Sequence, residues 1–129
     1  MKTSITKIFE FEAAHHLPLY DGKCRDIHGH TYKLEVTVSS QALTKSGPKT
    51  GMVMDFGSLK EIVKTEILDH IDHTDLNTIW PQGPTAEIVC RWIFEVLDAE
   101  LLRLNNSMLQ LEKVRLWETS TSYAEVGED

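Results

Sequence analysis

The segment His30–Ser39 alternates apolar and polar side chains, and this pattern constrains the fold more than any other feature of the sequence. A period of two residues predicts a half-buried antiparallel β-strand, with one face toward a core and one toward water. After residue 55 the apolar spacing changes to that of amphipathic helices. The apolar face of the predicted strand consists of Tyr32, Leu34, Val36 and Val38.

The other elements complete the order strand, strand, helix, helix, strand, strand. Ile5–Ala13 is the predicted first strand. Asp55 and Thr85 are predicted helix N-caps, because helically spaced apolar residues follow each of them. Leu111–Glu118 and Ser122–Val126 are the predicted third and fourth strands.

Two helices on one face of a four-stranded antiparallel sheet make an α+β architecture. We expect a single domain over residues 1–129, since a chain of 129 residues can bury a core without disulfides. Such a sheet has two unpaired edges and one uncovered face, which favours oligomerisation.

Composition and charge exclude several classes of function. The net charge is −7, whereas nucleic acids and anionic membranes are bound by basic surfaces. Charged residues interrupt Glu87–Leu104, the longest apolar stretch, so no membrane span is expected. The N-terminus lacks an export signal, and two cysteines give no disulfide framework, so we expect a cytoplasmic protein.

Histidines are concentrated near the start of the chain, where four of the six lie between positions 15 and 30. In an extended chain His28 and His30 point to the same side, so their imidazoles can converge on one ion. A third ligand can come from His15 or His16, and His15 has the inward parity of its strand. Three imidazoles with an open fourth position are typical of catalytic Zn²⁺. The alternative is a histidine-rich strand end without a metal.

The two cysteines are predicted to differ in role. Cys24 lies in a loop between Lys23 and Arg25, four residues before His28. A nearby metal and two cations favour a thiolate, so Cys24 is a candidate base or nucleophile. It could instead be a fourth metal ligand or an inert small side chain. Cys90, in the second predicted helix, is interpreted as a packing residue.

Two Asp-His dipeptides, Asp69-His70 and Asp72-His73, lie at the end of the first predicted helix. A histidine beside a carboxylate can transfer protons. Spacing alone does not choose between the two pairs. Both could also be solvated residues at a helix C-terminus, where the dipole favours histidine.

Glu118 continues the apolar parity of the third strand, so its carboxylate is predicted to point into a pocket. A buried carboxylate is costly unless it is paired. A ligand with adjacent N–H donors would satisfy both oxygens. The alternative is that the strand ends there and Glu118 lies in water.

Taken in order, the motifs of this chain resemble those of the 6-pyruvoyltetrahydropterin synthase superfamily, and within it the 6-carboxytetrahydropterin synthases. Three residues separate Cys24 from His28, as in the carboxy-forming enzymes, whereas pyruvoyl-forming relatives of animal type have a longer spacing. The matching motifs are Phe11-Glu12-Ala13-Ala14-His15, Cys24-x-x-x-His28-Gly29-His30, Met54-Asp55-Phe56, Asp72-His73-Thr74-Asp75-Leu76-Asn77, Pro84-Thr85-Ala86-Glu87 and Trp117-Glu118-Thr119.

This resemblance implies roles for nine site residues and selects the later Asp-His pair, since only that pair is followed by Leu-Asn. The implied zinc ligands are His15, His28 and His30. The implied catalytic residues are Cys24, Asp72 and His73. The implied pterin-binding residues are Glu118, Thr85 and Glu87.

The resemblance also implies a fold, an assembly and an activity. The fold is the tunnelling fold, a ββααββ unit whose subunits form an oligomeric barrel. The assembly is a trimer or a dimer of trimers with active sites between subunits, where Asp72 and His73 serve a neighbour's zinc. The activity is zinc-dependent conversion of 7,8-dihydroneopterin triphosphate to 6-carboxytetrahydropterin, acetaldehyde and triphosphate, in queuosine biosynthesis. The alternatives are 6-pyruvoyltetrahydropterin synthase, which stops after triphosphate elimination, and a non-catalytic zinc- or pterin-binding oligomer.

Overall fold

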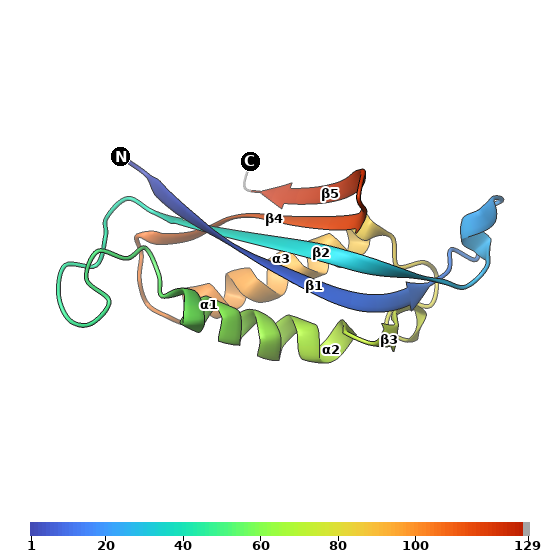
Figure 1. Ribbon diagram of the computed structural model, residues 1–129, viewed down its shortest axis with the longest axis horizontal. Helices are drawn as coiled ribbons and strands as arrows, with labels where there is room; N and C mark the ends of the chain where they lie inside the picture. The colour runs from blue at the N-terminus through green and yellow to red at the C-terminus, as the bar shows by residue number, and fades with distance from the viewer. Residues whose placement is uncertain (128–129) are drawn as a thin grey trace.

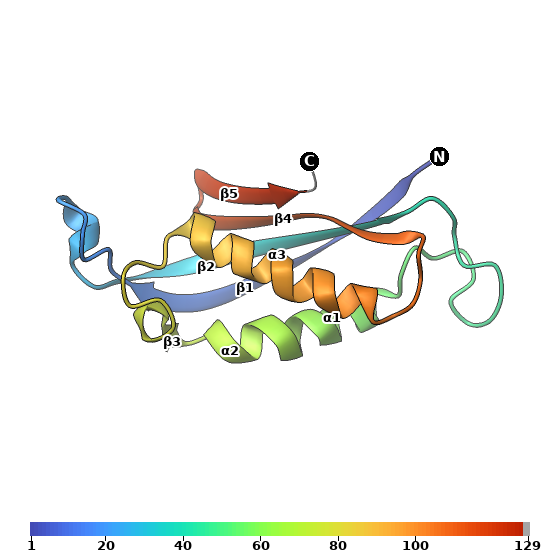
Figure 2. The same ribbon diagram turned by 180° about the vertical axis from the view of Figure 1, so that it is seen from behind.

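One twisted β-sheet spans the length of the molecule, and the helices cover one of its faces (Figures 1 and 2). The structure is a computed structural model that describes residues 1–127. The strand order is β3-β1-β2-β4-β5. The strands are β1 (Thr3–His15), β2 (His28–Ser40), β3 (Thr74–Asp75), β4 (Leu109–Thr119) and β5 (Ser122–Gly127).

The predicted helix N-caps are both confirmed. Asp55 accepts a hydrogen bond from the Ser58 amide at 3.0 Å, and Thr85 accepts one from the Ile88 amide at 3.2 Å. A π-helical turn interrupts the first helical stretch. The helical elements are α1 (Phe56–Val63), the π-helical η2 (Lys64–Leu68), α2 (Asp69–Ile71), α3 (Ala86–Leu102) and two 3₁₀ turns, η1 (Lys23–Arg25) and η3 (Leu76–Thr78). Within residues 1–127 none of these helices is long and apolar enough to cross a membrane.

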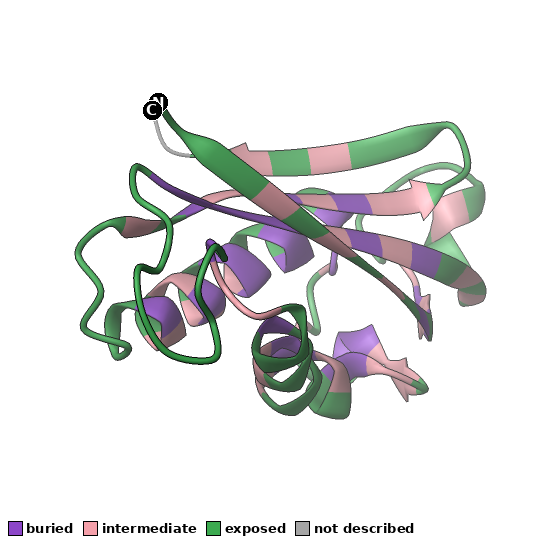
Figure 3. Ribbon diagram, turned by 60° about the vertical axis from the view of Figure 1, so that its left-hand side comes forward, coloured by how far each residue is buried: buried purple, intermediate pink, exposed green. Residues whose placement is uncertain are grey.

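The hydrophobic core lies between the helices and the inner face of the sheet, where Figure 3 shows the buried residues. The apolar face predicted for β2 is confirmed, because Tyr32, Leu34, Val36 and Val38 are all buried. Cys90 packs in this core, as interpreted from the sequence. The sheet and helices therefore form a rigid frame that fixes the ends of the strands.

The sheet has five strands where the sequence predicted four, and the additional strand is not antiparallel. The two-residue β3 runs parallel to β1, pairing Ala13 with Thr74 and Ala14 with Asp75. The chain enters β3 through His73, whose φ of 59° lies in the left-handed region. This turn lets the segment after α2 run along β1, which local sequence patterns did not indicate.

Two short loops with their own hydrogen bonds lie at opposite ends of the sheet. The segment 16–27 connects β1 to β2 and contains a 3₁₀ turn, η1 (Lys23–Arg25). The segment 41–55 leads from β2 to α1 and extends from the other end of the molecule (Figure 1). The residues that the sequence predicted to bind metal lie at the η1 end of the sheet.

The core makes a direct prediction about stability. Leu116 is fully buried, so Leu116→Ala should lower the free energy of unfolding by about 2–5 kcal/mol. Ile8 is 57% exposed on the open face, and Ile8→Ala should change it by at most about 0.5 kcal/mol. Urea unfolding of both variants at one protein concentration measures the difference, and equal effects would contradict the assigned core.

The two thiols should differ sharply in reactivity. Cys90 is buried, its Sγ donates to the Val114 carbonyl at 3.4 Å, and burial raises its pKa to about 11. Cys24 is only partly buried in η1. Iodoacetamide at pH 8 should therefore modify Cys24 and spare Cys90 in the folded protein, as read by peptide mass spectrometry. Denatured protein, in which both thiols react, is the control.

Candidate active site

Three imidazoles meet at the end of the β1–β2 hairpin. The register pairs His15 with His28 and Ala13 with His30, so the predicted antiparallel pairing brings these strand ends together. One ligand atom from each of the three histidines lies within 4.8 Å of the others. The Nε2 atoms of His15 and His30 are 3.1 Å apart, and His15 is 1% exposed. The structure thus groups the three histidines that the sequence singled out.

Main-chain carbonyls orient two of these rings. His15 Nδ1 lies 3.0 Å from the Pro84 carbonyl, and His28 Nδ1 lies 2.7 Å from the Asp26 carbonyl. A carbonyl accepts hydrogen bonds only, so each Nδ1 carries the proton and donates it. Each Nε2 then keeps a free lone pair, which is the arrangement of a metal-binding histidine.

The charge state of His30 also suits a cation. Burial is the main cause that lowers the pKa of His30, and the neighbouring histidines act in the same direction. Glu118 opposes this effect. A neutral imidazole is the form that binds a metal, so the donor set fits Zn²⁺ with three protein nitrogens and an open position.

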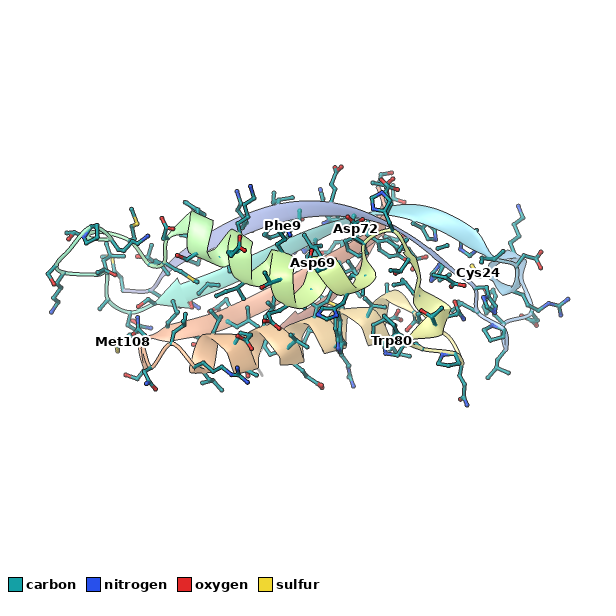
Figure 4. All side chains as sticks on the ribbon, turned by 90° about the horizontal axis from the view of Figure 1, so that it is seen from below. Phe9, Cys24, Asp69, Asp72, Trp80 and Met108 are labelled. Atoms are coloured by element: carbon teal, nitrogen blue, oxygen red, sulfur yellow. The ribbon has the colours of Figure 1, made fainter. Side chains whose placement is uncertain are left out.

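Two further candidate ligands stay outside the cluster. His16 contributes no atom to it; its side-chain Nδ1 is buried without a hydrogen-bond partner, while its main chain is held by Asn77. Cys24 also contributes none, which argues against its being a fourth ligand within the described residues. Figure 4 shows Cys24 in the loop beyond the ends of β1 and β2. The Leu17 amide donates to the Cys24 carbonyl at 2.6 Å and helps to hold this loop.

Glu118 connects the histidine cluster to a cavity. Its Oε1 lies 3.5 Å from His30 Nε2, and its side chain is 25% exposed. It lines a cavity of about 300 Å³ together with Glu87 at the start of α3 and Tyr123 on β5. The predicted inward direction of Glu118 therefore agrees with the structure. Thr85 lies two residues before Glu87 in the sequence, but it does not line this cavity. Its hydroxyl caps α3 instead.

Asp72 and His73 form a close pair, with Asp72 Oδ1 2.9 Å from His73 Nδ1. The main chain of Glu12 holds both residues: its amide donates to Asp72 Oδ1 at 3.0 Å, and its carbonyl accepts from the His73 amide at 2.6 Å. Asp69, by contrast, pairs with Lys64 on the helix surface. Figure 4 shows Asp72 against β1 and Asp69 on the helix. The two Asp-His dipeptides therefore have different surroundings, and the one that the resemblance selected is bonded to β1.

The Asp72–His73 pair lies beside the edge of β1, next to a second cavity. His73, whose side chain is 76% exposed, lines a cavity of about 500 Å³ with Glu12 and Thr31. Glu12 and Thr31 alternate with the residues that point toward the metal cluster, so they face the opposite side of the sheet. The same cavity is also lined by His30, so it adjoins both the Asp72–His73 pair and the histidine cluster, although His73 contributes no atom to that cluster.

Sequence reasoning missed the groups that support the cluster. Two are the carbonyls of Asp26 and Pro84, which orient the rings, and main-chain atoms leave no direct signal in a sequence. A third is the carboxamide of Asn77, although the motif that contains it was recognised. A fourth is the buried hydroxyl of Tyr32, 3.4 Å from His15 Nδ1.

Comparisons with known proteins agree with this geometry. Residues 4–129 match the family model described as 6-pyruvoyl tetrahydropterin synthase. A 6-carboxy-5,6,7,8-tetrahydropterin synthase of Haemophilus influenzae is 40% identical over 145 residues, covering 96% of this chain and 98% of that protein. One from Synechocystis is 41% identical over 121 residues, covering 93% and 89%.

A solved structure agrees as well. The 6-pyruvoyl tetrahydropterin synthase of Caenorhabditis elegans matches with a TM-score of 0.78 and 27% identity, covering 100% of this chain and 97% of that one. The tunnelling fold predicted from the resemblance is thereby confirmed. The match over residues 4–129, together with two relatives at about 40% identity, shows that the chain belongs to the 6-pyruvoyl tetrahydropterin synthase family.

Proposed function

We propose that the chain is a zinc-dependent 6-carboxy-5,6,7,8-tetrahydropterin synthase that acts on 7,8-dihydroneopterin triphosphate. The observation that carries the proposal is the cluster of His15, His28 and His30 beside Glu118, at the edge of a cavity. The names of the relatives from Haemophilus and Synechocystis support the carboxy product. The three-residue spacing between Cys24 and His28 supports it independently.

Glu118 is the proposed anchor of the pterin ring. A carboxylate accepts two N–H groups side by side, and the amino group and ring N–H of a pterin present such a pair. A cavity of about 300 Å³ is at the lower end of the range for small-molecule sites. With the ring held there, the substrate side chain extends toward the three histidines, which fixes its orientation. Glu87 and Thr85 are proposed to border the same site.

Cys24 and the Asp72–His73 pair are the proposed proton-transfer groups. Bound to the three histidines, Zn²⁺ would supply Lewis acidity toward the side-chain hydroxyls. Cys24 would remove a proton from the substrate side chain as a thiolate. His73, oriented by Asp72, would return and accept protons at neighbouring oxygens. In the balanced reaction, 7,8-dihydroneopterin triphosphate and one water yield 6-carboxytetrahydropterin, acetaldehyde and triphosphate.

The complete site is proposed to lie between subunits of a homo-oligomer, a trimer or a dimer of trimers. Within the described residues His73 contributes no atom to the histidine cluster, and its side chain is 76% exposed, which leaves it accessible to a second copy of the chain. Within residues 1–127, β5 and the first ten residues of β1 have no strand on their outer edges. Pairing of such edges between copies is a common way to complete a sheet.

Product analysis tests the reaction. Zinc-loaded protein incubated with 7,8-dihydroneopterin triphosphate should give 6-carboxytetrahydropterin and acetaldehyde by mass spectrometry. Cys24→Ala should lower the rate by about 10²–10⁴-fold, because a proton-transfer group is lost, with zinc content unchanged. Cys90→Ala is the matched control and should keep wild-type turnover.

Other products would redirect the assignment. A 6-pyruvoyl product without acetaldehyde would place the chain with the pyruvoyl-forming enzymes, with the same site residues. Zinc binding without any turnover would instead support the non-catalytic binding role.

Mixing two inactive variants tests the shared site. His28→Ala damages the metal cluster and His73→Ala damages the proton-transfer pair, so each alone should be inactive. After subunit exchange in equal amounts, roughly a quarter of the sites should combine intact halves from two chains and regain activity. No regained activity, despite exchange shown by native mass spectrometry of tagged subunits, would contradict a site built between chains.

A further inference from the structure

The carboxamide of Asn77 forms two hydrogen bonds with the main chain of His16, just after the end of β1. Its Oδ1 accepts from the His16 amide at 2.9 Å, and its Nδ2 donates to the His16 carbonyl at 3.0 Å. Asn77 is 9% exposed, so these hydrogen bonds are shielded from water. The Asp75 side chain in turn accepts a hydrogen bond from the Asn77 main-chain amide at 3.0 Å, which helps to fix Asn77. The Asn77 side chain thus supplies the hydrogen bonds that a neighbouring strand would make, because β3 ends at Asp75.

The two hydrogen bonds from Asn77 complete a continuous series of bonds along one edge of β1. Glu12 bonds to Asp72 and His73 through its main chain, and Ala13 and Ala14 pair with β3. Asn77 then takes the two main-chain groups of His16. His15, the residue between, is held through its ring by the Pro84 carbonyl. Every residue from 12 to 16 is therefore bonded to the segment 72–84 or paired with it.

The position of these two hydrogen bonds matters because the neighbouring residue, His15, belongs to the histidine cluster. His15 is the last residue of β1, and a strand end frays unless its polar groups have partners. Without Asn77, the His16 amide and carbonyl would lose their bonds in a partly buried place. The main chain that carries the His15 ring would then be free to move relative to His28 and His30.

We propose that Asn77 is a positioning residue for the metal site, acting through the His16 main chain to fix His15. The proposal rests on the metal site of the proposed function. It extends the site to a residue that touches neither the metal cluster nor the cavity beside Glu118. Groups that orient metal ligands typically change metal affinity by about 10–100-fold when they are removed.

Metal affinity tests the proposal without an activity assay. Zn²⁺ binding to the intact protein is measured by competition with a chromophoric chelator, and Co²⁺ replaces Zn²⁺ to report coordination geometry in the visible spectrum. Asn77→Ala should weaken Zn²⁺ binding about 10-fold or more and alter the Co²⁺ spectrum. Thr78→Ala is the matched control, since it removes a hydrogen bond to the Asp75 carbonyl from the same turn without touching His16.

The thermal midpoint of the metal-free variants separates positioning from general destabilisation. If Asn77→Ala lowers that midpoint but binds Zn²⁺ as tightly as wild type, Asn77 supports only the fold and the proposal is overturned. If the alanine variant does not fold, Asn77→Asp gives the same comparison, because it keeps the acceptor for the His16 amide and loses the donor to the carbonyl. Wild-type protein that binds no Zn²⁺ would instead overturn the proposed metal site itself.

Discussion

The register between β1 and β2 is the constraint on which the candidate site depends. It places His15 opposite His28 and Ala13 opposite His30, so residues far apart in sequence meet at one strand end. A slip of one residue would turn every side chain of a strand to the other face. The same register buries Phe11 and Tyr32, whose rings stack with centroids 4.8 Å apart. The histidine cluster is therefore continuous with the hydrophobic core, and the packing that stabilises the fold also holds the imidazoles.

Polar main-chain groups provide the second level of organisation. The end of β1 is attached to the segment after α2, and this segment carries the Asp72–His73 pair. His15 of the histidine cluster and the contacts of the Asp72–His73 pair thus lie along the same strand edge. Each residue from 12 to 16 therefore has a partner in the segment 72–84.

The sequence predicted the parts of this structure that depend on periodicity. The alternation in β2, the caps at Asp55 and Thr85 and the inward direction of His15 follow from side-chain patterns. The strand β3 was missed because two residues are too short for a period and its partner is non-local. The roles of the nine site residues came from a family resemblance; the structure brings the cluster and Glu118 together, whereas Asp72 and His73 contribute no atom to the cluster.

The left-handed backbone conformation at His73 is one that glycine adopts more easily than histidine. An L residue with a side chain generally pays about 1 kcal/mol or more for this conformation, which glycine adopts freely. Glycine would make the turn into β3 with less strain, but it would remove the imidazole. The turn into β3 therefore combines a modest conformational cost with an exposed imidazole that glycine could not supply.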